Sequence, residues 1–317
     1  MTPSRRELLQ LLGASSALLA VGCTATGSED APLATAVLDP DEDSFVVAVW
    51  SRLSARDVTV TVRAGDQTIS ELRSTLDGEI GKIEVTGLEP GTTYSVAIEF
   101  GGLLLQHVVR TAPALDDPRA VRLAISADCD PNPAFASGML DAVVAAEPDL
   151  FISLGDFPYT DNGPPAQTVA QYRARHVQLR GHAPVQRMLG ACGLYAIYDD
   201  HEFRNDWDAR FVAAEPGRYA AAMAVWDEFF PQRGETGDIR YRSWRWGAHV
   251  ECFLLDCRRF RSANAAPDDE RKTMLGAEQH AWLVDGVTRS TATFKLVLTS
   301  VALDYGDGMD HWVGFRT

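Results

Sequence analysis

The sequence predicts a multidomain chain in which a small all-β sandwich precedes an α/β domain built from packed mixed β-sheets flanked by helices. Residues 45–110 alternate polar and apolar side chains with a period of two, which is typical of strands with one buried face. After Pro118, short continuous apolar runs alternate with helical stretches, as they do when strands are buried inside an α/β sheet. The proline- and acid-rich residues 111–118 between these regions mark a domain boundary.

The overall composition is that of a folded, acidic protein. Of the 317 residues, 46% are hydrophobic, which is enough for a sizeable core and excludes disorder for most of the chain. The net charge of −15 argues against specific nucleic-acid binding, which normally uses a basic face, and against attraction to anionic membranes. Five cysteines are too few for a disulfide scaffold. We expect a monomer.

Residues 1–22 are predicted to be an export signal. Arg5 and Arg6 precede an apolar run over residues 8–21 that is too short and too interrupted to span a bilayer comfortably. The paired arginines resemble the twin-arginine motif, so the twin-arginine export machinery is an expected partner. Residues 20–23, Ala-Val-Gly-Cys, resemble a lipobox, which would make Cys23 a lipid anchor. We therefore expect an exported protein, periplasmic or at the cell surface, that touches the membrane through this anchor alone.

Residues 23–42 are predicted to be a flexible tether between the anchor and the folded body. They begin with small and polar residues and contain prolines, a composition that disfavours a packed core.

Residues 43–113 form the predicted sandwich. Val58, Val60 and Val62 alternate with polar side chains, and turn residues separate short strands. Residues 87–94, Gly-Leu-Glu-Pro-Gly-Thr-Thr-Tyr, resemble a turn of fibronectin type III domains in which the tyrosine hydroxyl fastens the corner. No cluster of titratable side chains accompanies this pattern. A scaffolding or substrate-shading role is therefore expected, with adhesion as the alternative.

Residues 118–317 form the predicted α/β domain, which places acidic residues at the ends of strands. Apolar runs at residues 121–127, 150–155, 194–198 and 250–255 lead to acids, and residues 294–300 are a further strand candidate. The acids are Asp128, Asp156, Asp199, Asp200 and Asp256. Ligands bind at the carboxyl ends of strands in such sheets.

Converging carboxylates repel one another unless a cation neutralises them, so a metal site is the simplest interpretation. Oxygen ligands favour calcium, magnesium, manganese or iron over copper. The alternative is that each acid caps a helix or forms a turn.

Two motifs in this domain resemble those of PhoD-like alkaline phosphatases, which belong to the calcineurin-like metallophosphoesterase superfamily. Residues 154–159 read Leu-Gly-Asp-Phe-Pro-Tyr and are similar to the family's Gly-Asp-x-x-Tyr pattern. Residues 198–206 contain its Asp-Asp-His-Glu block, and residues 255–261 and 310–315 resemble further family segments. Because the family also carries an export signal and a fibronectin-like domain, the resemblance spans nearly the whole chain.

The resemblance implies a multinuclear metal centre with Fe(III) and Ca(II), with manganese, magnesium or zinc as alternatives. By position, Asp156 would bridge the metals, while Cys129 and Tyr159 would bind iron, because thiolate and phenolate suit a ferric ion. Residues 128–130, Asp-Cys-Asp, depart from the family's Ser-Cys-Gln and are closer to the Asp-x-His opening of the broader superfamily, which implies that Asp128 would be a ligand instead of, or beside, Cys129. The full predicted ligand set is Asp128, Cys129, Asp156, Tyr159, Asp200 and Asn205.

The same resemblance implies hydrolysis of phosphate monoesters or diesters, so small phosphate esters or phosphodiesters are the expected substrates. A metal-bound hydroxide would attack phosphorus while the metals neutralise the charge growing on oxygen. The expected catalytic residues are Asp156, His201, which would orient phosphate or protonate the leaving oxygen, and Arg204, which would clamp phosphate. For Arg258 we expect pairing with local carboxylates.

The family pattern is expected to be incomplete at the C-terminus. PhoD-like enzymes continue past the segment that matches residues 315–317 with another strand and a Gly-Asp-x-His motif, and no such motif follows Ala302. Turnover by the chain as written is therefore expected to be weak or absent. The alternatives are a non-catalytic, surface-anchored binding protein that uses the β domain and, among enzymes, a phospholipase D-like diesterase.

Overall fold

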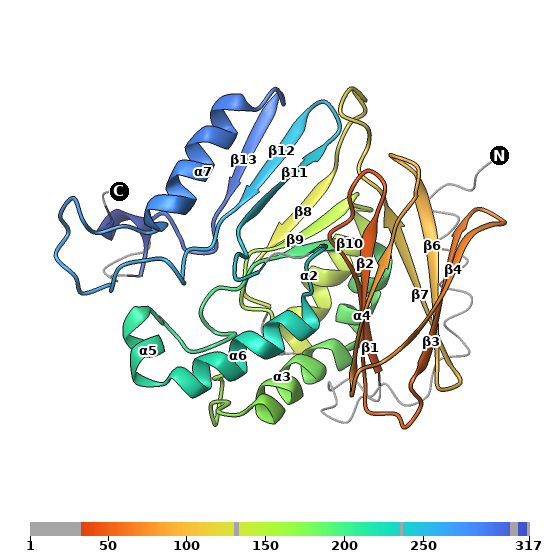
Figure 1. Ribbon diagram of the computed structural model, residues 1–317, viewed down its shortest axis with the longest axis horizontal. Coiled ribbons are helices and arrows are strands. Elements are labelled where there is room, and N and C mark those ends of the chain that lie inside the picture. Colours follow the sequence, from red (N-terminus) through yellow and green to blue (C-terminus); the bar gives the residue numbers. More distant parts are fainter. Residues whose placement is uncertain (1–32, 130–132, 235–236, 305–309, 316–317) are drawn as a thin grey trace.

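The computed structural model describes residues 33–129, 133–234, 237–304 and 310–315, with the backbone alone for residues 133–137. The predicted signal at residues 1–22 and the Cys23 anchor lie outside these ranges. In chain order (Figure 1), the elements are β1 (Leu33–Leu38), β2 (Phe45–Ser51), β3 (Asp57–Ala64), β4 (Gln67–Thr75), β5 (Ile80–Val85), β6 (Thr93–Phe100), β7 (Leu103–Arg110), β8 (Leu123–Ser126), α2 (Pro133–Ala145), β9 (Leu150–Ser153), α3 (Val169–Gly181), α4 (Ala183–Ala191), β10 (Gly193–Ala196), α5 (Ala209–Ala214), α6 (Pro216–Phe229), β11 (Arg242–Trp246), β12 (Val250–Leu254), α7 (Gly276–Arg289), β13 (Phe294–Leu298) and the short 3-10 helix η2 (Trp312–Gly314).

The first part of the molecule consists of two β-sheets that face each other (Figure 1). One has the strand order β4-β3-β6-β7, and the other begins β5-β2-β1. Alternate residues are buried between them, so that Val58, Val60 and Val62 expose 1% or less of their surface. At the predicted corner, the Tyr94 hydroxyl accepts a hydrogen bond from the Glu89 amide at 2.8 Å. The strand-rich region that the alternation predicts is thus confirmed.

Strand β1 corrects the predicted flexible tether over residues 23–42. Its six residues, Leu-Ala-Thr-Ala-Val-Leu, are all buried. They pair with β2 along their whole length, and Leu38 also pairs in parallel with Leu194 of β10. Small and aliphatic side chains fit between neighbours on both faces of a sheet. The tether prediction is therefore wrong for residues 33–38, which form a central strand.

Because β1 has partners on both sides, a single six-stranded sheet runs from the sandwich into the α/β part, in the order β5-β2-β1-β10-β9-β8. A buried histidine also joins the two parts. His107 of β7 is hydrogen bonded through Nε2 to Thr35 Oγ1 (2.8 Å) and through Nδ1 to the Leu189 carbonyl of α4 (3.0 Å). Burial lowers the pKa of His107, which favours its neutral form at this junction.

In the α/β part, the parallel strands β8, β9 and β10 lie between two layers (Figure 1). Helices α3, α4 and α6 cover one face of the six-stranded sheet. The three-stranded sheet β11-β12-β13 covers the other face, where the rings of Tyr195 and Trp244 stack at 3.7 Å. Helix α7 packs on this second sheet through Trp282, which contacts Phe253. These layers confirm the predicted packed mixed sheets flanked by helices.

The strands predicted after Pro118 are present. Residues 121–127, 150–155, 194–198, 250–255 and 294–300 correspond to β8, β9, β10, β12 and β13, with the strand ends a few residues shorter. The continuous apolar pattern is explained by burial on two faces, since all four residues of both β9 and β10 are buried.

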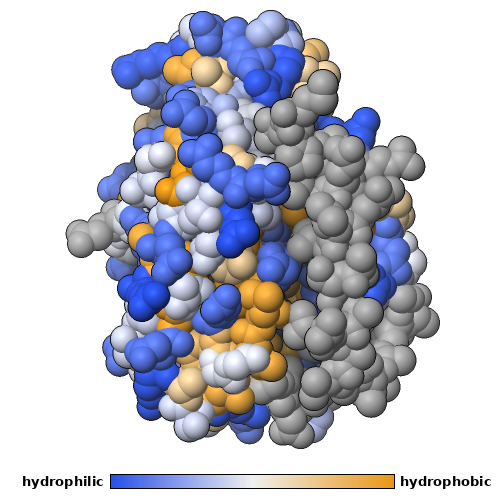
Figure 2. Space-filling view, turned by 90° about the vertical axis from the view of Figure 1, so that its right-hand side faces the viewer, coloured by the Kyte–Doolittle hydropathy of each residue, from blue (hydrophilic) through white to orange (hydrophobic). Residues whose placement is uncertain are grey.

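The end of the molecule that carries the sandwich has a mixed surface. Figure 2 shows hydrophilic residues over much of this face and hydrophobic residues gathered in its lower half, beside the residues drawn in grey. Among the described residues, no helix combines the length and the apolar character needed to cross a bilayer.

Candidate metal centre

The candidate centre is built on the carboxyl ends of β8, β9 and β10. The last residues of these strands are in register, with Ser126 opposite Ser153 and Ser153 opposite Ala196. The loops that follow therefore leave the sheet side by side and bring Asp128 and Asp156 to the same edge. The predicted convergence of strand-end acids thus rests on strand register.

Close backbone contacts hold these loops together. Asp128 N donates to Gly155 O (3.3 Å) and Cys129 N donates to Asp156 O (3.0 Å). Gly155 has a φ of +112°, and a Cβ there would lie 2.4 Å from the Cβ of Asp199, so this approach requires glycine. Asp128 and Asp156 both have a φ of 56°, a left-handed conformation that non-glycine residues adopt mainly in turns and at functional sites.

Two groups of side chains among the described residues could hold a metal ion. In each group, the candidate ligand atoms lie within 4.8 Å of one another. The first consists of Asp156, Asp200 and His201, all of which the sequence predicts as site residues. The second consists of Asp200, Asp206 and Asp310. Asp200 belongs to both groups, so it lies where a two-ion site would share a ligand.

When no cation is bound, burial opposes full ionisation of the carboxyl groups at this site. Burial, reinforced by the charges of Glu202, Asp199 and Asp200, raises the pKa of Asp156 to about 10. Burial also raises the pKa of Glu202 to about 8 and that of Asp200 to about 6, the latter despite the nearby Arg258. A cation between these oxygens would stabilise their charged forms, so the donor set fits a metal ion.

Tyr159, a predicted iron ligand, lies beside the first group. Its hydroxyl donates to Asp128 Oδ1 at 2.9 Å, and its ring lies 4.2 Å from that of His201. Burial and the charges of Asp156 and Asp128 raise the pKa of Tyr159, which keeps it a phenol unless a cation binds it.

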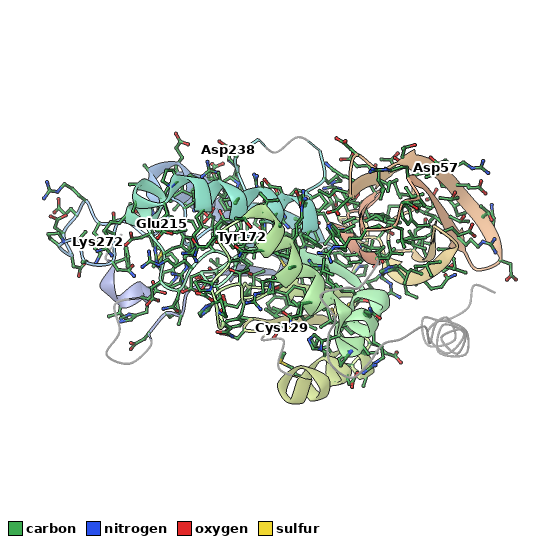
Figure 3. The ribbon with its side chains drawn as sticks, turned by 90° about the horizontal axis from the view of Figure 1, so that it is seen from below. Asp57, Cys129, Tyr172, Glu215, Asp238 and Lys272 are labelled. Atoms are coloured by element: carbon green, nitrogen blue, oxygen red, sulfur yellow. The ribbon has the colours of Figure 1, made fainter. Side chains whose placement is uncertain are left out.

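Cys129, the second predicted iron ligand, is 5% exposed and belongs to the core behind the loops (Figure 3). The close groups of possible ligands among the described residues include neither Cys129 nor Asp128. Their backbones, however, belong to the same set of loop contacts as Asp156.

Asp161 is a site residue that the sequence reasoning missed. Its Oδ1 lies 2.6 Å from His201 Nδ1, and its Oδ2 accepts the Asn205 amide at 2.7 Å. Burial by itself would lower the pKa of His201, but Asp161 and Asp200 outweigh it and raise this pKa. The available signal was the position of Asp161 in the loop that carries Asp156 and Tyr159.

Glu202 joins two of the loops. It is 1% exposed, and its carboxylate accepts the Phe157 amide at 2.7 Å and the Asp199 amide at 3.0 Å. The Asp-Asp-His-Glu block contains this residue, and the structure indicates a positioning role for it. Its two bonds set the spacing between the loops that follow β9 and β10.

Arg258 lies beneath the carboxylates with a side chain that is 2% exposed. Its guanidinium contacts Asp199 at 2.6 Å, Asp200 at 3.5 Å and Asp310 at 2.8 Å. The prediction that Arg258 pairs with local carboxylates is confirmed. Burial would raise the pKa of Asp310, but Arg258 and Arg261 lower it to about 2. Asp310 is therefore already neutralised by arginine, which weakens the second group as a cation site.

The side chains of two predicted site residues point away from Asp156. Arg204, expected to clamp phosphate, has a half-exposed side chain that pairs with Glu215 at 3.4 Å and lies over the Phe211 ring. The side-chain amide of Asn205 donates to Asp206 at 3.2 Å. The loop after β10 turns outward here, so sequence proximity to His201 does not direct these side chains to Asp156.

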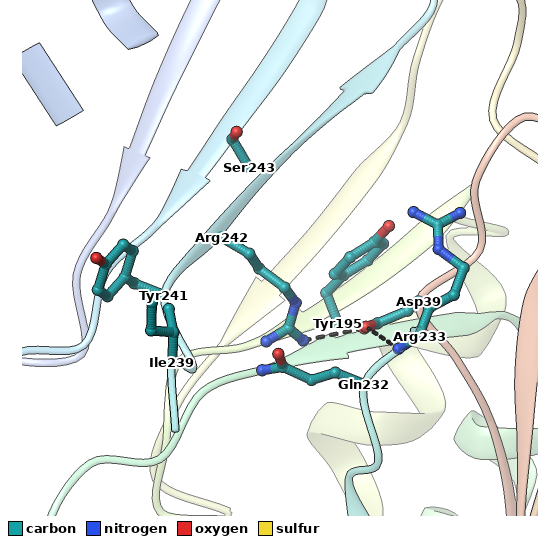
Figure 4. Close-up of a pocket in the computed structure, with 8 residues that line it drawn as sticks. All are labelled: Asp39, Tyr195, Gln232, Arg233, Ile239, Tyr241, Arg242 and Ser243. Carbon is teal, nitrogen blue, oxygen red and sulfur yellow. Dashed lines mark hydrogen bonds and ion pairs between the residues drawn. The ribbon is translucent and has the colours of Figure 1, made fainter. Parts of the chain in front are cut away.

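A separate cavity of about 290 Å³ lies where β10, β11 and the end of β1 meet. Figure 4 shows its basic residues beside Asp39, which accepts Arg242 at 2.9 Å and the Arg233 amide at 3.3 Å. None of the residues that line it belongs to the two metal-binding groups. We therefore place the chemistry at the strand ends rather than in this cavity.

Comparison with known proteins finds one family. A model described as PhoD-like phosphatase matches residues 129–311, which is more than half of the chain. The matched segment begins at Cys129 and includes both groups of possible metal ligands.

Two individual proteins are also similar. Alkaline phosphatase D of Bacillus subtilis (strain 168) is 27% identical over 212 residues, which cover 53% of this chain and 36% of the relative. A solved structure described as "Structure of PhoD" has a TM-score of 0.76 at 22% identity, and the match covers 89% of this chain and 66% of that chain. The chain thus spans little more than a third of the curated relative, and the structural match shows a common fold.

Proposed function

The chain belongs to the PhoD-like phosphatase family, and from this premise we propose that it hydrolyses phosphate esters with the help of metal ions held at the strand ends. The observation that carries the proposal is the group Asp156, Asp200 and His201, whose ligand atoms lie within 4.8 Å of one another. Burial raises the pKa of both carboxyl groups, so the group favours a bound cation over free carboxylates.

Asp156 and Asp200 would hold the ions, with Tyr159, Cys129, Asp128 and Asn205 as further candidates. Thiolate and phenolate donors favour Fe(III), and carboxylates favour Ca(II), which supports this pair as the proposed metals. When bound, such ions supply Lewis acidity and stabilise the charge that develops on phosphoryl oxygens.

His201 is the proposed proton carrier. Its Nδ1 is engaged by Asp161 at 2.6 Å, which leaves Nε2 to contact the phosphate or the leaving oxygen. Arg258 cannot serve as a free phosphate clamp, because its guanidinium is already shared among three carboxylates.

The proposal also covers the location of the enzyme and the domain that lies beside its site. The signal-like residues 1–22 and Cys23 support export and attachment at the cell surface. The paired sheets of the first part and the Tyr94 corner support a fibronectin type III-like scaffold beside the site. Both monoesters and diesters remain proposed substrates.

We also propose that the open edges of the two sheets pair with a further strand. β8 and β13 end their sheets, and Ile125, Phe294 and Val297 expose 44%, 60% and 48% of their surface there. Exposed apolar residues on unpaired strand edges favour association with another strand.

Metal content and hydrolysis measured on one preparation test the proposed function. We expect bound metal by elemental analysis and slow hydrolysis of an aryl phosphate, lost on chelation and restored by Fe(III) and Ca(II). Comparison with an aryl phosphodiester separates the monoesterase from the diesterase. Bound metal without hydrolysis of either ester would favour the binding-protein alternative, and a chain that binds no metal would contradict the proposal.

The substitution Asp161→Asn tests the orientation of His201. We expect hydrolysis to fall by about 10- to 100-fold, as it does when a partner of an active-site ligand is removed, with metal content retained. Because Asp161 helps to raise the pKa of His201, this pKa should fall in the variant, as measured by NMR titration of the metal-free chain. Asp141→Asn, at an exposed carboxylate on α2, is the matched control. An unchanged His201 pKa would contradict the assigned contact.

A further inference from the structure

Arg180 of α3 is a buried cation without a carboxylate partner in the described part of the chain. It is 4% exposed, and its guanidinium lies 4.6 Å from the Phe229 ring and 4.7 Å from the Phe230 ring. Nη1 contacts His176 at Nδ1 (3.2 Å) and at the carbonyl (3.3 Å), whereas Nη2 is buried and has no hydrogen-bond partner among the described residues. Buried charges are normally paired, and in the described part of the chain the group that raises the pKa of Arg180 is the Cys129 thiol rather than a carboxylate.

Trp50 of β2 presents a second donor without an acceptor. It is 2% exposed, and its buried Nε1 has no hydrogen-bond partner within the part of the chain that the structure describes. Its ring stacks on Phe229 at 6.0 Å, the same ring that Arg180 covers. Buried indole N–H groups usually find a partner. Two unpaired donors therefore lie around one phenylalanine.

A small cavity lies between these two residues. Its volume is about 10 Å³, room for one particle of about the size of a water molecule. Trp50 and Arg180 line it together with Phe229, and the floor is formed by small residues of β1 and β2, which leave the space open. These are Ala34, Ala36 and Ala48.

The chemistry of the lining selects an anion. A water molecule accepts hydrogen bonds but also needs acceptors for its own two protons. The carboxylate at the cavity, Glu228, is already held by Arg173 through two contacts of 2.6 Å. Phosphate, carboxylates and other polyatomic anions are too large for this space. A monatomic anion needs donors and a positive charge alone, and the cavity offers both.

We propose that this cavity is a halide site in which chloride accepts hydrogen bonds from Arg180 Nη2 and Trp50 Nε1. The bound ion would neutralise Arg180 and join α3 to strands β1 and β2 of the six-stranded sheet. The site lies outside the metal-binding groups, so the proposal does not depend on the proposed hydrolysis.

Thermal unfolding in chloride and in gluconate at equal ionic strength tests the site, because gluconate does not fit the cavity. For the metal-loaded chain we expect the melting temperature to rise by about 5 °C at chloride concentrations near 100 times the dissociation constant. Trp50→Phe keeps the ring and removes one donor, so it should lose at least half of this shift. Trp244→Phe is the matched control, because Trp244 Nε1 is also buried without a partner among the described residues but lies between the two sheets, away from Arg180. It should keep the whole shift.

Crystals soaked in bromide locate the ion independently of stability. We expect an anomalous peak between Arg180 Nη2 and Trp50 Nε1. Equal melting temperatures in the two salts, an equal loss of the shift in both tryptophan variants, or an ordinary water at this position in the bromide crystals would each overturn the proposal.

Discussion

Replacing Asp156 by alanine is expected to remove the bound metal and to lower hydrolysis by about 10³-fold or more, while making the metal-free chain more stable. The first effect follows from the position of Asp156 in the group with Asp200 and His201. The second follows from burial and electrostatics, because this buried carboxyl group lies among four other acids that oppose its ionisation. Elemental analysis and hydrolysis assays measure the first effect, and denaturant unfolding of the metal-free proteins measures the second.

The raised pKa of Asp156 determines how the stability gained by Asp156→Ala in the metal-free chain changes with pH. Burial raises the pKa of Asp156 from 3.8 to about 10, so the folded metal-free chain keeps a proton that the unfolded chain releases. The stability linked to this proton is complete below pH 3.8 and is lost as the pH rises toward 10. The advantage of Asp156→Ala over the metal-free parent should therefore grow with pH, and metal should reverse the order of stability.

Asp141→Ala is the control for this experiment, because its carboxylate is exposed on α2 and pairs with Arg187 at the surface. It should leave metal content, hydrolysis and the pH profile unchanged. If Asp156→Ala retains both metal and activity, the assignment of the centre is wrong. If the metal-free variant is less stable than the metal-free parent, Asp156 is a structural residue.

The second large effect is expected for Arg258→Met, which should lower the free energy of unfolding by about 3–5 kcal/mol. The substitution keeps much of the side-chain volume but removes the cation shared by Asp199, Asp200 and Asp310. Asp199 and Asp200 would then lose their neutralising partner while Asp310 keeps Arg261, and at least one of the stranded carboxylates would have to take up a proton. Denaturant unfolding of the metal-free proteins at constant pH measures the loss.

The matched control is Arg289→Met, at an exposed arginine that pairs with Asp285 one helical turn away. Surface pairs of this kind contribute about 0.5 kcal/mol or less, so the control should be nearly neutral. If Arg258→Met lowers the free energy of unfolding by less than about 1 kcal/mol, other groups must neutralise the three acids in place of Arg258. In the double variant Arg258→Met with Asp199→Asn, part of the lost stability should return, because one of the stranded charges is removed.

Much of the fold and part of the site could be predicted from the residues alone. Continuous apolar runs identified β8, β9, β10, β12 and β13. For β9 and β10 the reason is burial on two faces, which requires apolar side chains at nearly every position. Asp156, Asp200 and His201 could be found because they follow such strands, and parallel strands end at one edge.

Other features could not be predicted because they depend on contacts between distant segments. β1 is a strand because β2 and β10 border it, and its six residues carry no strong strand signal by themselves. Asp161 matters because it reaches His201, forty residues further along the chain. The contact of Arg204 with Glu215 likewise depends on the path of the loop after β10.

The sequence by itself determined the layers of this protein and the type of chemistry at its strand ends, because hydrophobic periodicity and local motifs are properties of neighbouring residues. The tertiary structure decided which acids meet, which are neutralised by Arg258 and which stay available for a cation, because burial and charge pairing depend on distances between segments. It also brought Arg180 and Trp50 to one small cavity, although 130 positions separate them in the chain.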